Sequence, residues 1–213
     1  MSRSRLELLA FLLSVVATVA CVFNGKEATQ QRKAAPADQT QGLTLEVPDA
    51  RWEPFFFKAL EERTHKIGIL SLRETVLPDN DLEMRFWYDH FETISGVIIR
   101  RSTGKWSATY LRQRYIQEPL SMQHESLGAP KSGWEATWKR LTDANILTLP
   151  DGSVNCKTEV LDGIGYVVET NVNRRYRTYM YGNPRLAKCD EAKQIVMIET
   201  ILSEEFQIPP SRK

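Results

Sequence analysis

Alternating hydrophobic and polar residues predict β-strands at several places along the chain. Residues 82–90 (LEMRFWYDH) alternate over their whole length, and a period of two places successive side chains on opposite faces of a sheet. The face expected to point to the core contains Leu82, Met84, Phe86 and Tyr88. The other face contains Glu83, Arg85, Trp87 and Asp89. Further strands are expected at 67–76, 165–170 and 174–181.

A β-hairpin is predicted in the middle of the chain. Residues 96–101 and 105–111 both have β character, and they flank the loop 102–104 (STG). A three-residue loop that contains glycine favours a tight connection between antiparallel strands. In this register Arg100 lies opposite Trp106, so a guanidinium would cover the indole ring.

Helical periodicity predicts a first helix over 52–63 and a last helix over 191–206, with Asp190 as the N-cap of the last one. The inward face of the last helix is expected to consist of Ala192, Ile195, Ile198, Ile201 and Leu202. Between them, a middle helix is predicted within 133–144, where Ser132 and Glu135 have the spacing of a capping box. Its core stripe contains Trp134, Trp138 and Leu141.

These elements predict the fold class and the organisation of the chain. Strands in runs, with helices before, between and after them, favour an α+β domain with a mostly antiparallel sheet and two to three packing helices. With 213 residues and 42% hydrophobic content, the chain can form one good core. We expect an apolar export segment at 1–20, a flexible tether at 21–47 and one globular domain at 48–213.

The amino terminus has the layout of an export signal. Arg3 and Arg5 precede the apolar or small stretch 8–20 (LLAFLLSVVATVA). This stretch is shorter than the roughly 20 residues that a helix needs to cross a bilayer. It is followed by a segment rich in Gln, Ala, Thr, Lys and Asp, which cannot bury enough apolar surface to fold and would serve as a tether.

The end of the apolar stretch resembles a bacterial lipoprotein signal, because the small residues Thr18 and Ala20 precede Cys21. The resemblance implies cleavage before Cys21 and a diacylglycerol on its sulfur. An uncleaved membrane anchor and an ordinary cleaved signal fit the same residues, and all three alternatives export the body of the protein. In a fourth alternative the chain is not exported and 8–20 is a core helix.

The two remaining cysteines, Cys156 and Cys189, make an even pair in an exported body, and we expect a disulfide between them. Two buried free thiols are the alternative. No metal, cofactor or catalytic residue is predicted. Neither cysteine has the histidine or CxxC neighbour of a zinc site, and His65, His90 and His124 are far apart in sequence.

Charge disfavours a role in binding nucleic acid. Residues 1–20 contain two Arg and one Glu, so the rest of the chain carries as many positive as negative side chains. A protein that neutralises many phosphates normally has a basic excess.

The segment 174–181 (RRYRTYMY) is the most distinctive patch. Alternation places on one face Arg175, Arg177, Tyr179 and Tyr181. Arginine and tyrosine together are typical of surfaces that recognise a protein, an acidic glycan or a phosphate. A solvent face whose long side chains shield tyrosine rings is the alternative.

We therefore expect a membrane-tethered protein that faces the periplasm or the cell exterior and binds or scaffolds a partner. That partner would be a protein or an acidic glycan, without nucleic acid or cofactor. An exported hydrolase that acts on an envelope polymer is the alternative, as is a single-anchor membrane protein with an extracytoplasmic domain.

Overall fold

The computed structural model describes residues 42–90, 93–114, 122–156, 158 and 163–208. The strands in this part of the chain are β1 (Thr44–Glu46), β2 (Leu82–His90), β3 (Thr93–Ser102), β4 (Lys105–Arg114), β5 (Gln123–Leu127), β6 (Gly165–Val172) and β7 (Arg175–Gly182). The helices are α1 (Trp52–Thr64), α2 (Trp134–Asp143), α3 (Gly152–Asn155) and α4 (Asp190–Phe206). Two short 3₁₀ helices, His65–Ile67 and Leu72–Glu74, follow α1.

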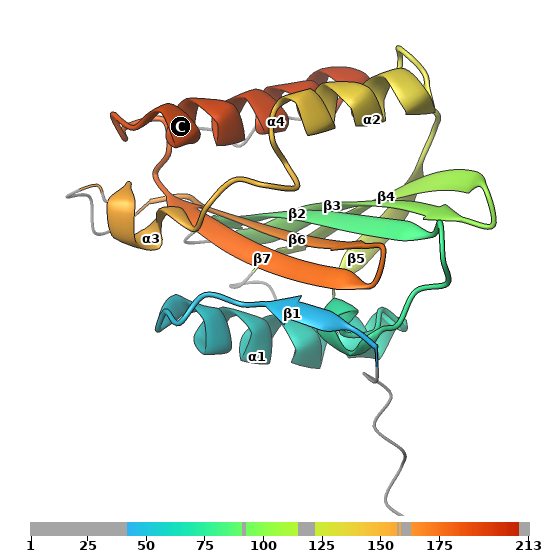
Figure 1. Ribbon diagram of the computed structural model, residues 1–213, viewed down its shortest axis with the longest axis horizontal. Helices are drawn as coiled ribbons and strands as arrows, with labels where there is room; N and C mark the ends of the chain where they lie inside the picture. Colours follow the sequence, from blue (N-terminus) through green and yellow to red (C-terminus); the bar gives the residue numbers. More distant parts are fainter. Residues whose placement is uncertain (1–41, 91–92, 115–121, 157, 159–162, 209–213) are drawn as a thin grey trace, which may run out of the picture. The chain divides into compact units, whose positions relative to one another are not determined.

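The seven strands form one sheet in the order β1-β7-β6-β2-β3-β4-β5. Every neighbouring pair is antiparallel except β1 and β7, which are parallel. Helices α2 and α4 lie over one face of this sheet, and α1 lies beneath the other (Figure 1). The structure therefore has the predicted α+β class with a mostly antiparallel sheet.

The core beneath α2 and α4 matches the hydrophobic pattern of the sequence. Met84 and Phe86 of β2 are fully buried there, and the Phe86 ring lies 5.5 Å from that of Tyr166. The predicted inward face of α4 is buried at all five positions. A period of 3.6 residues placed these side chains on one stripe, and the sheet supplies the apolar surface that covers them.

Strand β2 is buried on both faces, whereas its pattern indicated a single core face. Glu83, Arg85 and Trp87 have exposed fractions of only 6%, 5% and 0%. Phe57 and Leu60 of α1 pack with Trp87 in a second hydrophobic cluster. A helix beneath the sheet thus converts the polar side of the pattern into a second interior layer.

The β3–β4 hairpin forms, but its register differs by one residue from the prediction. The turn contains two residues, Thr103 and Gly104, with φ of +50° and +76°, and a two-residue turn of this kind matches the twist of the strands. Arg101, rather than Arg100, therefore lies opposite Trp106, with its guanidinium carbon 5.2 Å from the indole centroid. The neighbouring Arg100 points to the other face of the sheet.

Two other predictions near the amino-terminal half are corrected. Residues 67–76 contain no strand; they consist of the end of the first 3₁₀ helix, a loop, the second 3₁₀ helix and the two residues after it. The segment assigned to the tether extended to residue 47, but β1 belongs to the sheet, where it pairs with β7 and forms one edge. Backbone pairing needs no hydrophobic side chains, so composition alone did not indicate this strand.

Cys156 and Cys189 are joined by a disulfide, in agreement with the prediction, and their Cα atoms lie 5.8 Å apart. The bond links the end of α3 to the residue before α4. A carboxylate oxygen of Glu191 lies 3.9 Å from the Cys156 sulfur, but two sulfurs bonded to each other do not offer the thiolates that metals bind. Cys21 lies outside the described residues, and its lipidation stays a prediction.

The start of α2 is capped from another helix. Glu135 accepts a hydrogen bond from Trp106 Nε1 instead of completing the predicted capping box. Buried Glu205 of α4 takes its place, because its carboxylate accepts hydrogen bonds from the backbone N–H and the hydroxyl of Ser132, both at 2.8 Å. It also pairs with Arg140. Burial on its own would raise the pKa of Glu205, but the bonds from Ser132 and Arg140 outweigh it and lower that pKa.

Glu205→Gln is expected to make stability less sensitive to acid. A carboxyl with a lowered pKa binds fewer protons in the folded than in the unfolded state, so its contribution is present above the ordinary pKa of 4.5 and disappears as the pH falls through the folded value. Urea unfolding should give wild type a higher free energy of unfolding than the variant at pH 7. At pH 3 the free energies of the two proteins should converge. The exposed neighbour in Glu204→Gln provides the control, and an equal effect there would contradict the prediction.

Gly96→Ala is expected to destabilise the fold by about 1 to 3 kcal/mol through overpacking. A Cβ atom at this position would lie 2.3 Å from the Trp87 ring, which is fully buried. Gly165→Ala is the matched control in the same sheet, because its Cβ would lie 3.6 Å from the Asp89 Cβ, an ordinary contact. Chemical denaturation of the two variants checks this, and equal losses of stability would contradict it.

Candidate functional site

The predicted recognition patch on β7 is not an exposed surface. Tyr179 and Tyr181 share one face of the strand, as predicted, but they are 0% and 1% exposed. Their hydroxyls donate hydrogen bonds to the carbonyls of Ile146 and Pro150, at 2.8 and 2.7 Å. Burial raises the pKa of both hydroxyls. The segment that follows α2 crosses this face, and therefore the two tyrosines are core residues.

The two arginines of that patch are engaged by the edge strand. Glu46 of β1 pairs with Arg175, and its Oε2 lies 3.2 Å from Arg177 Nε. Arg177 is largely buried, with a side-chain exposed fraction of 17%. The prediction of a four-residue partner surface is therefore corrected, because only Arg175 of the four remains largely exposed.

On the α1 side of the sheet, two rows of side chains run across β2, β3 and β4. The strand registers form the first row from Glu83, Arg100 and Ser107. They form the second row from Arg85, Ile98 and Thr109. These six residues line a cavity of about 320 Å³, which is also bounded by Gly68, Ile69, Leu70 and Thr75. We call it the arginine cavity.

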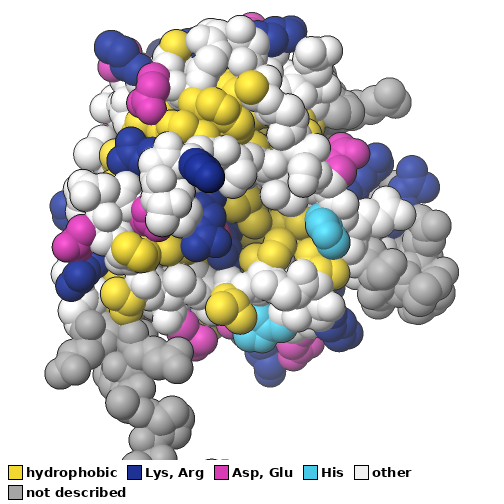
Figure 2. Space-filling model, turned by 90° about the vertical axis from the view of Figure 1, so that its right-hand side faces the viewer, with side chains coloured by type: hydrophobic (Ala, Val, Ile, Leu, Met, Phe, Trp, Pro, Cys, Tyr) yellow, Lys and Arg dark blue, Asp and Glu magenta, His cyan; other side chains and the backbone are white. Residues whose placement is uncertain are grey.

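Polar and apolar side chains meet in this cavity. In Figure 2, Lys and Arg side chains likewise lie beside hydrophobic ones around a hollow in the molecular surface. The volume of the arginine cavity falls at the lower end of the range for small-molecule sites.

The loop that covers the cavity contains Gly68, Ile69 and Leu70, and hydrogen bonds of its backbone hold it in place. Gly68 ends the first 3₁₀ helix with a φ of +77°, a conformation that favours glycine. The N–H of Ile69 then donates to the carbonyl of Thr64 at 3.0 Å, which turns the chain back over the sheet. Arg85 Nη2 donates to the carbonyl of Leu70 at 2.9 Å, so the floor of the cavity is tied directly to its cover.

Arg85 is a buried cation with two carboxylates around it. Its Nε donates to Glu83 Oε1 at 2.7 Å. Burial opposes its charge, but Glu169 and Glu83 outweigh that effect and raise the pKa of Arg85. Burial raises the pKa of Glu169, although Arg85 and hydrogen bonds from Trp87 Nε1 and the Tyr176 hydroxyl oppose the rise. These contacts hold the guanidinium in one orientation.

Several polar groups of the arginine cavity are available to a ligand. Arg100 is about half exposed, and its Nε lies 3.7 Å from Glu83 Oε2, a loose contact. Considering only described residues, the hydroxyls of Ser107 and Thr109 have no hydrogen-bond partner. The cavity thus presents guanidinium donors, two hydroxyls and a carboxylate to one small volume.

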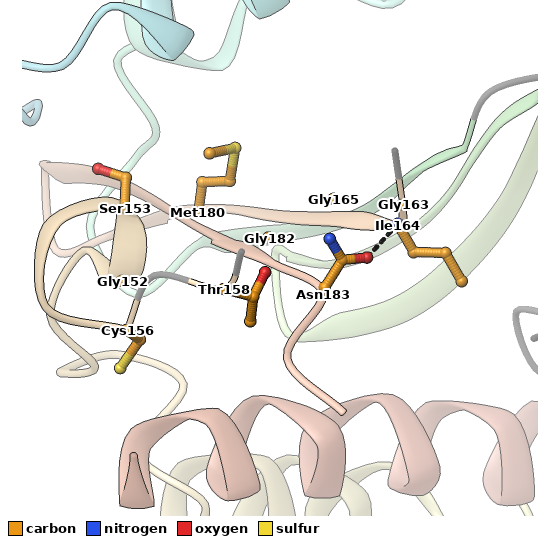
Figure 3. A pocket seen from close by; sticks show the side chains of 10 residues that line it. All are labelled: Gly152, Ser153, Cys156, Thr158, Gly163, Ile164, Gly165, Met180, Gly182 and Asn183. Carbon is orange, nitrogen blue, oxygen red and sulfur yellow. Dashed lines mark hydrogen bonds between the residues drawn. The ribbon is translucent and has the colours of Figure 1, made fainter. Parts of the chain in front are cut away.

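A second cavity, of about 270 Å³, lies beside Cys156 and the adjoining ends of β6 and β7 (Figure 3). Asn183 Oδ1 accepts a hydrogen bond from Ile164 N–H at 2.9 Å, and a Cβ at Gly163 would lie only 1.6 Å from that oxygen. None of its described lining residues carries a charge. It therefore offers fewer means of recognising a ligand than the arginine cavity.

The arginine cavity was not found from the sequence. Glu83 and Arg85 were assigned to the less hydrophobic face of one strand, which is ordinarily exposed to solvent. Their partners Arg100 and Thr109 come from two other strands, and the one-residue error in the hairpin register would have paired Arg100 with the wrong residue. The only available signal was a Glu-x-Arg spacing, which is common on solvated strands.

Comparison of the chain with protein-family models and with curated proteins finds no match. Between residues 42 and 208, as far as the structure describes them, no helix is both long and apolar enough to span a membrane.

Proposed function

We propose that this protein is a membrane-tethered, envelope-exposed binding protein whose globular domain holds a small anionic ligand in the arginine cavity. The observation that carries the proposal is the pair Arg85 and Arg100, two guanidiniums that line one small cavity together with a single lining carboxylate. Guanidiniums bind carboxylate and phosphate oxygens through directed, charge-assisted hydrogen bonds. The tether rests on the lipoprotein-like amino terminus, and the disulfide agrees with an oxidising compartment.

The lining favours binding over hydrolysis. The two hydroxyls, Ser107 and Thr109, would need an adjacent base to become nucleophiles. The lining residues include no histidine, and the one carboxylate among them, that of Glu83, is already engaged by Arg85. Arg85 is held in place at the floor of the cavity, and Arg100 is half exposed at its side. Two such cations suit the binding of an anion better than its chemical conversion.

Binding can be tested by titrating the purified full-length protein with acetate, inorganic phosphate and glucuronate, followed by NMR. We expect shifts at Arg100, Ser107 and Thr109. Arg100→Gln should weaken the binding of the best anion by about tenfold, the usual effect of losing a charged hydrogen-bond donor. Arg101→Gln is the matched control, because Arg101 is adjacent in sequence but points to the opposite face and covers Trp106.

Two results would contradict this function. One is the absence of shifts around the cavity with all three anions. The other is an equal loss of affinity in Arg100→Gln and Arg101→Gln, which would indicate a general electrostatic effect instead of a defined site.

The tether is tested separately by the intact mass of the protein extracted from membranes of its native host. A chain that starts at Cys21 and carries a lipid increment would support the anchored form. An unprocessed mass in the membrane fraction would support the uncleaved anchor, whereas an unprocessed chain in the soluble fraction would overturn the proposed localisation.

A further inference from the structure

The charge of the arginine cavity limits the charge of its ligand. The lining contains two cations, Arg85 and Arg100, and one anion, Glu83, so it carries at most one net positive charge. Glu169 is the cross-strand neighbour of Arg85 on β6 and reduces the local positive potential further when it is ionised. A monoanion such as a carboxylate can be neutralised here. A phosphate group, with a charge near −2 at neutral pH, would remain uncompensated in a partly buried site.

The hydroxyl groups indicate what else the ligand carries. Ser107 and Thr109 project from alternate positions of β4 toward the same face, each at the end of one arginine-containing row. Neither hydroxyl is used by another described residue. A hydroxyl both donates and accepts one or more hydrogen bonds, as ligand hydroxyls do. A ligand without polar groups at these positions would leave both unpaired on binding, at a cost in affinity.

Part of the lining of the arginine cavity is apolar. Ile69 and Ile98 line it, and Leu70 is exposed over 67% of its surface beside them. Such residues suit a ligand with one aliphatic C–H face. A volume of about 320 Å³ is sufficient for a single ring with its substituents and too small for an extended chain to be enclosed.

Resting on the proposed function, we infer that the ligand is a hydroxylated monocarboxylate of the sugar-acid class. Its carboxylate is bound by Arg85 and Arg100, its ring hydroxyls by Ser107, Thr109 and Glu83, and its C–H face by the isoleucines. The same chemistry is offered by a free sugar acid and by a uronic-acid residue within a polysaccharide.

The test is calorimetric titration of the full-length protein with sodium glucuronate, glucose, acetate and inorganic phosphate. We expect glucuronate to bind at least tenfold more tightly than each of the other three. Thr109→Val keeps the shape of the side chain but removes its hydroxyl. It should weaken glucuronate binding by about threefold to tenfold, the effect of one hydrogen bond. Thr200→Val is the control, because Thr200 is exposed on α4, beyond the other face of the sheet.

The outcomes separate this inference from the function on which it rests. If anions bind at Arg100 but glucuronate binds no better than acetate or phosphate, the sugar-acid class is wrong and the anion-binding function stands. If none of the anions binds, both fail. A short uronate oligomer that binds more tightly than glucuronate would assign the site to a polysaccharide, and equal affinity would assign it to the free sugar acid.

Discussion

Arg85→Met is expected to lower the free energy of unfolding by about 3 to 5 kcal/mol, the range for removing one partner from a buried ion pair. The variant keeps most of the side-chain volume but removes the cation that faces Glu83 and Glu169, both of which are buried. It also removes the hydrogen bond to the Leu70 carbonyl. Urea denaturation followed by tryptophan fluorescence would measure the loss.

Two further variants define the origin of this loss. Arg100→Met removes a half-exposed cation near the same Glu83 and should cost less than about 1 kcal/mol. Glu169→Gln, added to Arg85→Met, should recover part of the stability, because the amide no longer leaves an uncompensated charge in the interior. Equal losses in Arg85→Met and Arg100→Met would contradict the assignment of Arg85 as a buried cation that pairs with Glu83 and interacts with the charge of Glu169.

Removal of the disulfide is expected to have the second-largest effect. The bond between Cys156 and Cys189 closes a loop with a sequence separation of 33, and in the chain-entropy model a loop of this size contributes roughly 3 to 4 kcal/mol. The double variant Cys156→Ser/Cys189→Ser should lose about that much stability in urea. It would also free α3 from α4, which the bond joins.

Reductant provides the internal control for this experiment. Dithiothreitol should lower the stability of wild type to nearly that of the double variant and leave the double variant unchanged. Cys21→Ser should respond to reductant as wild type does. A wild-type protein that is insensitive to reductant, although its thiols become titratable, would show that the bond contributes little to stability.

The stability of the interior and the geometry of the arginine cavity depend on the same residues. Arg85 is held by Glu83 and by the Leu70 carbonyl before any ligand arrives, so little side-chain entropy is lost on binding. Arg100 is less constrained. We therefore expect substitutions at Arg85 to change stability and affinity together, whereas Arg100 variants change mainly affinity.

The local hydrophobic pattern of the sequence was sufficient to predict an element and the face of it that packs against one layer of the core. The alternation in β2 predicted that strand and one of its two buried faces, and the 3.6-residue period of α4 predicted the helix and its inward face. The disulfide followed from an even pair of cysteines in a chain with an export-like amino terminus. In each case the signal lies within one segment or in a simple count.

The local sequence pattern did not predict the surroundings of residues that contact a second layer of the structure or a segment distant in sequence. Tyr179 and Tyr181 have polar hydroxyls and follow arginines, so they resembled a surface, but carbonyls that follow α2 accept their hydrogen bonds. Capping of α2 was assigned to the nearest glutamate, whereas Glu205 provides it from α4. These partners are separated by about 30 and by 73 residues in sequence.

Because periodicity and composition act over short distances, the sequence alone predicted the class of the fold and most of its longer strands and helices, and it favoured the disulfide between Cys156 and Cys189. Which polar residues are interior depends on the packing of elements that are distant in sequence. The placement of α1 beneath the sheet buries Arg85, and the registers of β2, β3 and β4 bring Arg100 and Thr109 to the same cavity. Cross-strand registers depend on turns and packing throughout the sheet, and a one-residue shift moves every side chain to the opposite face.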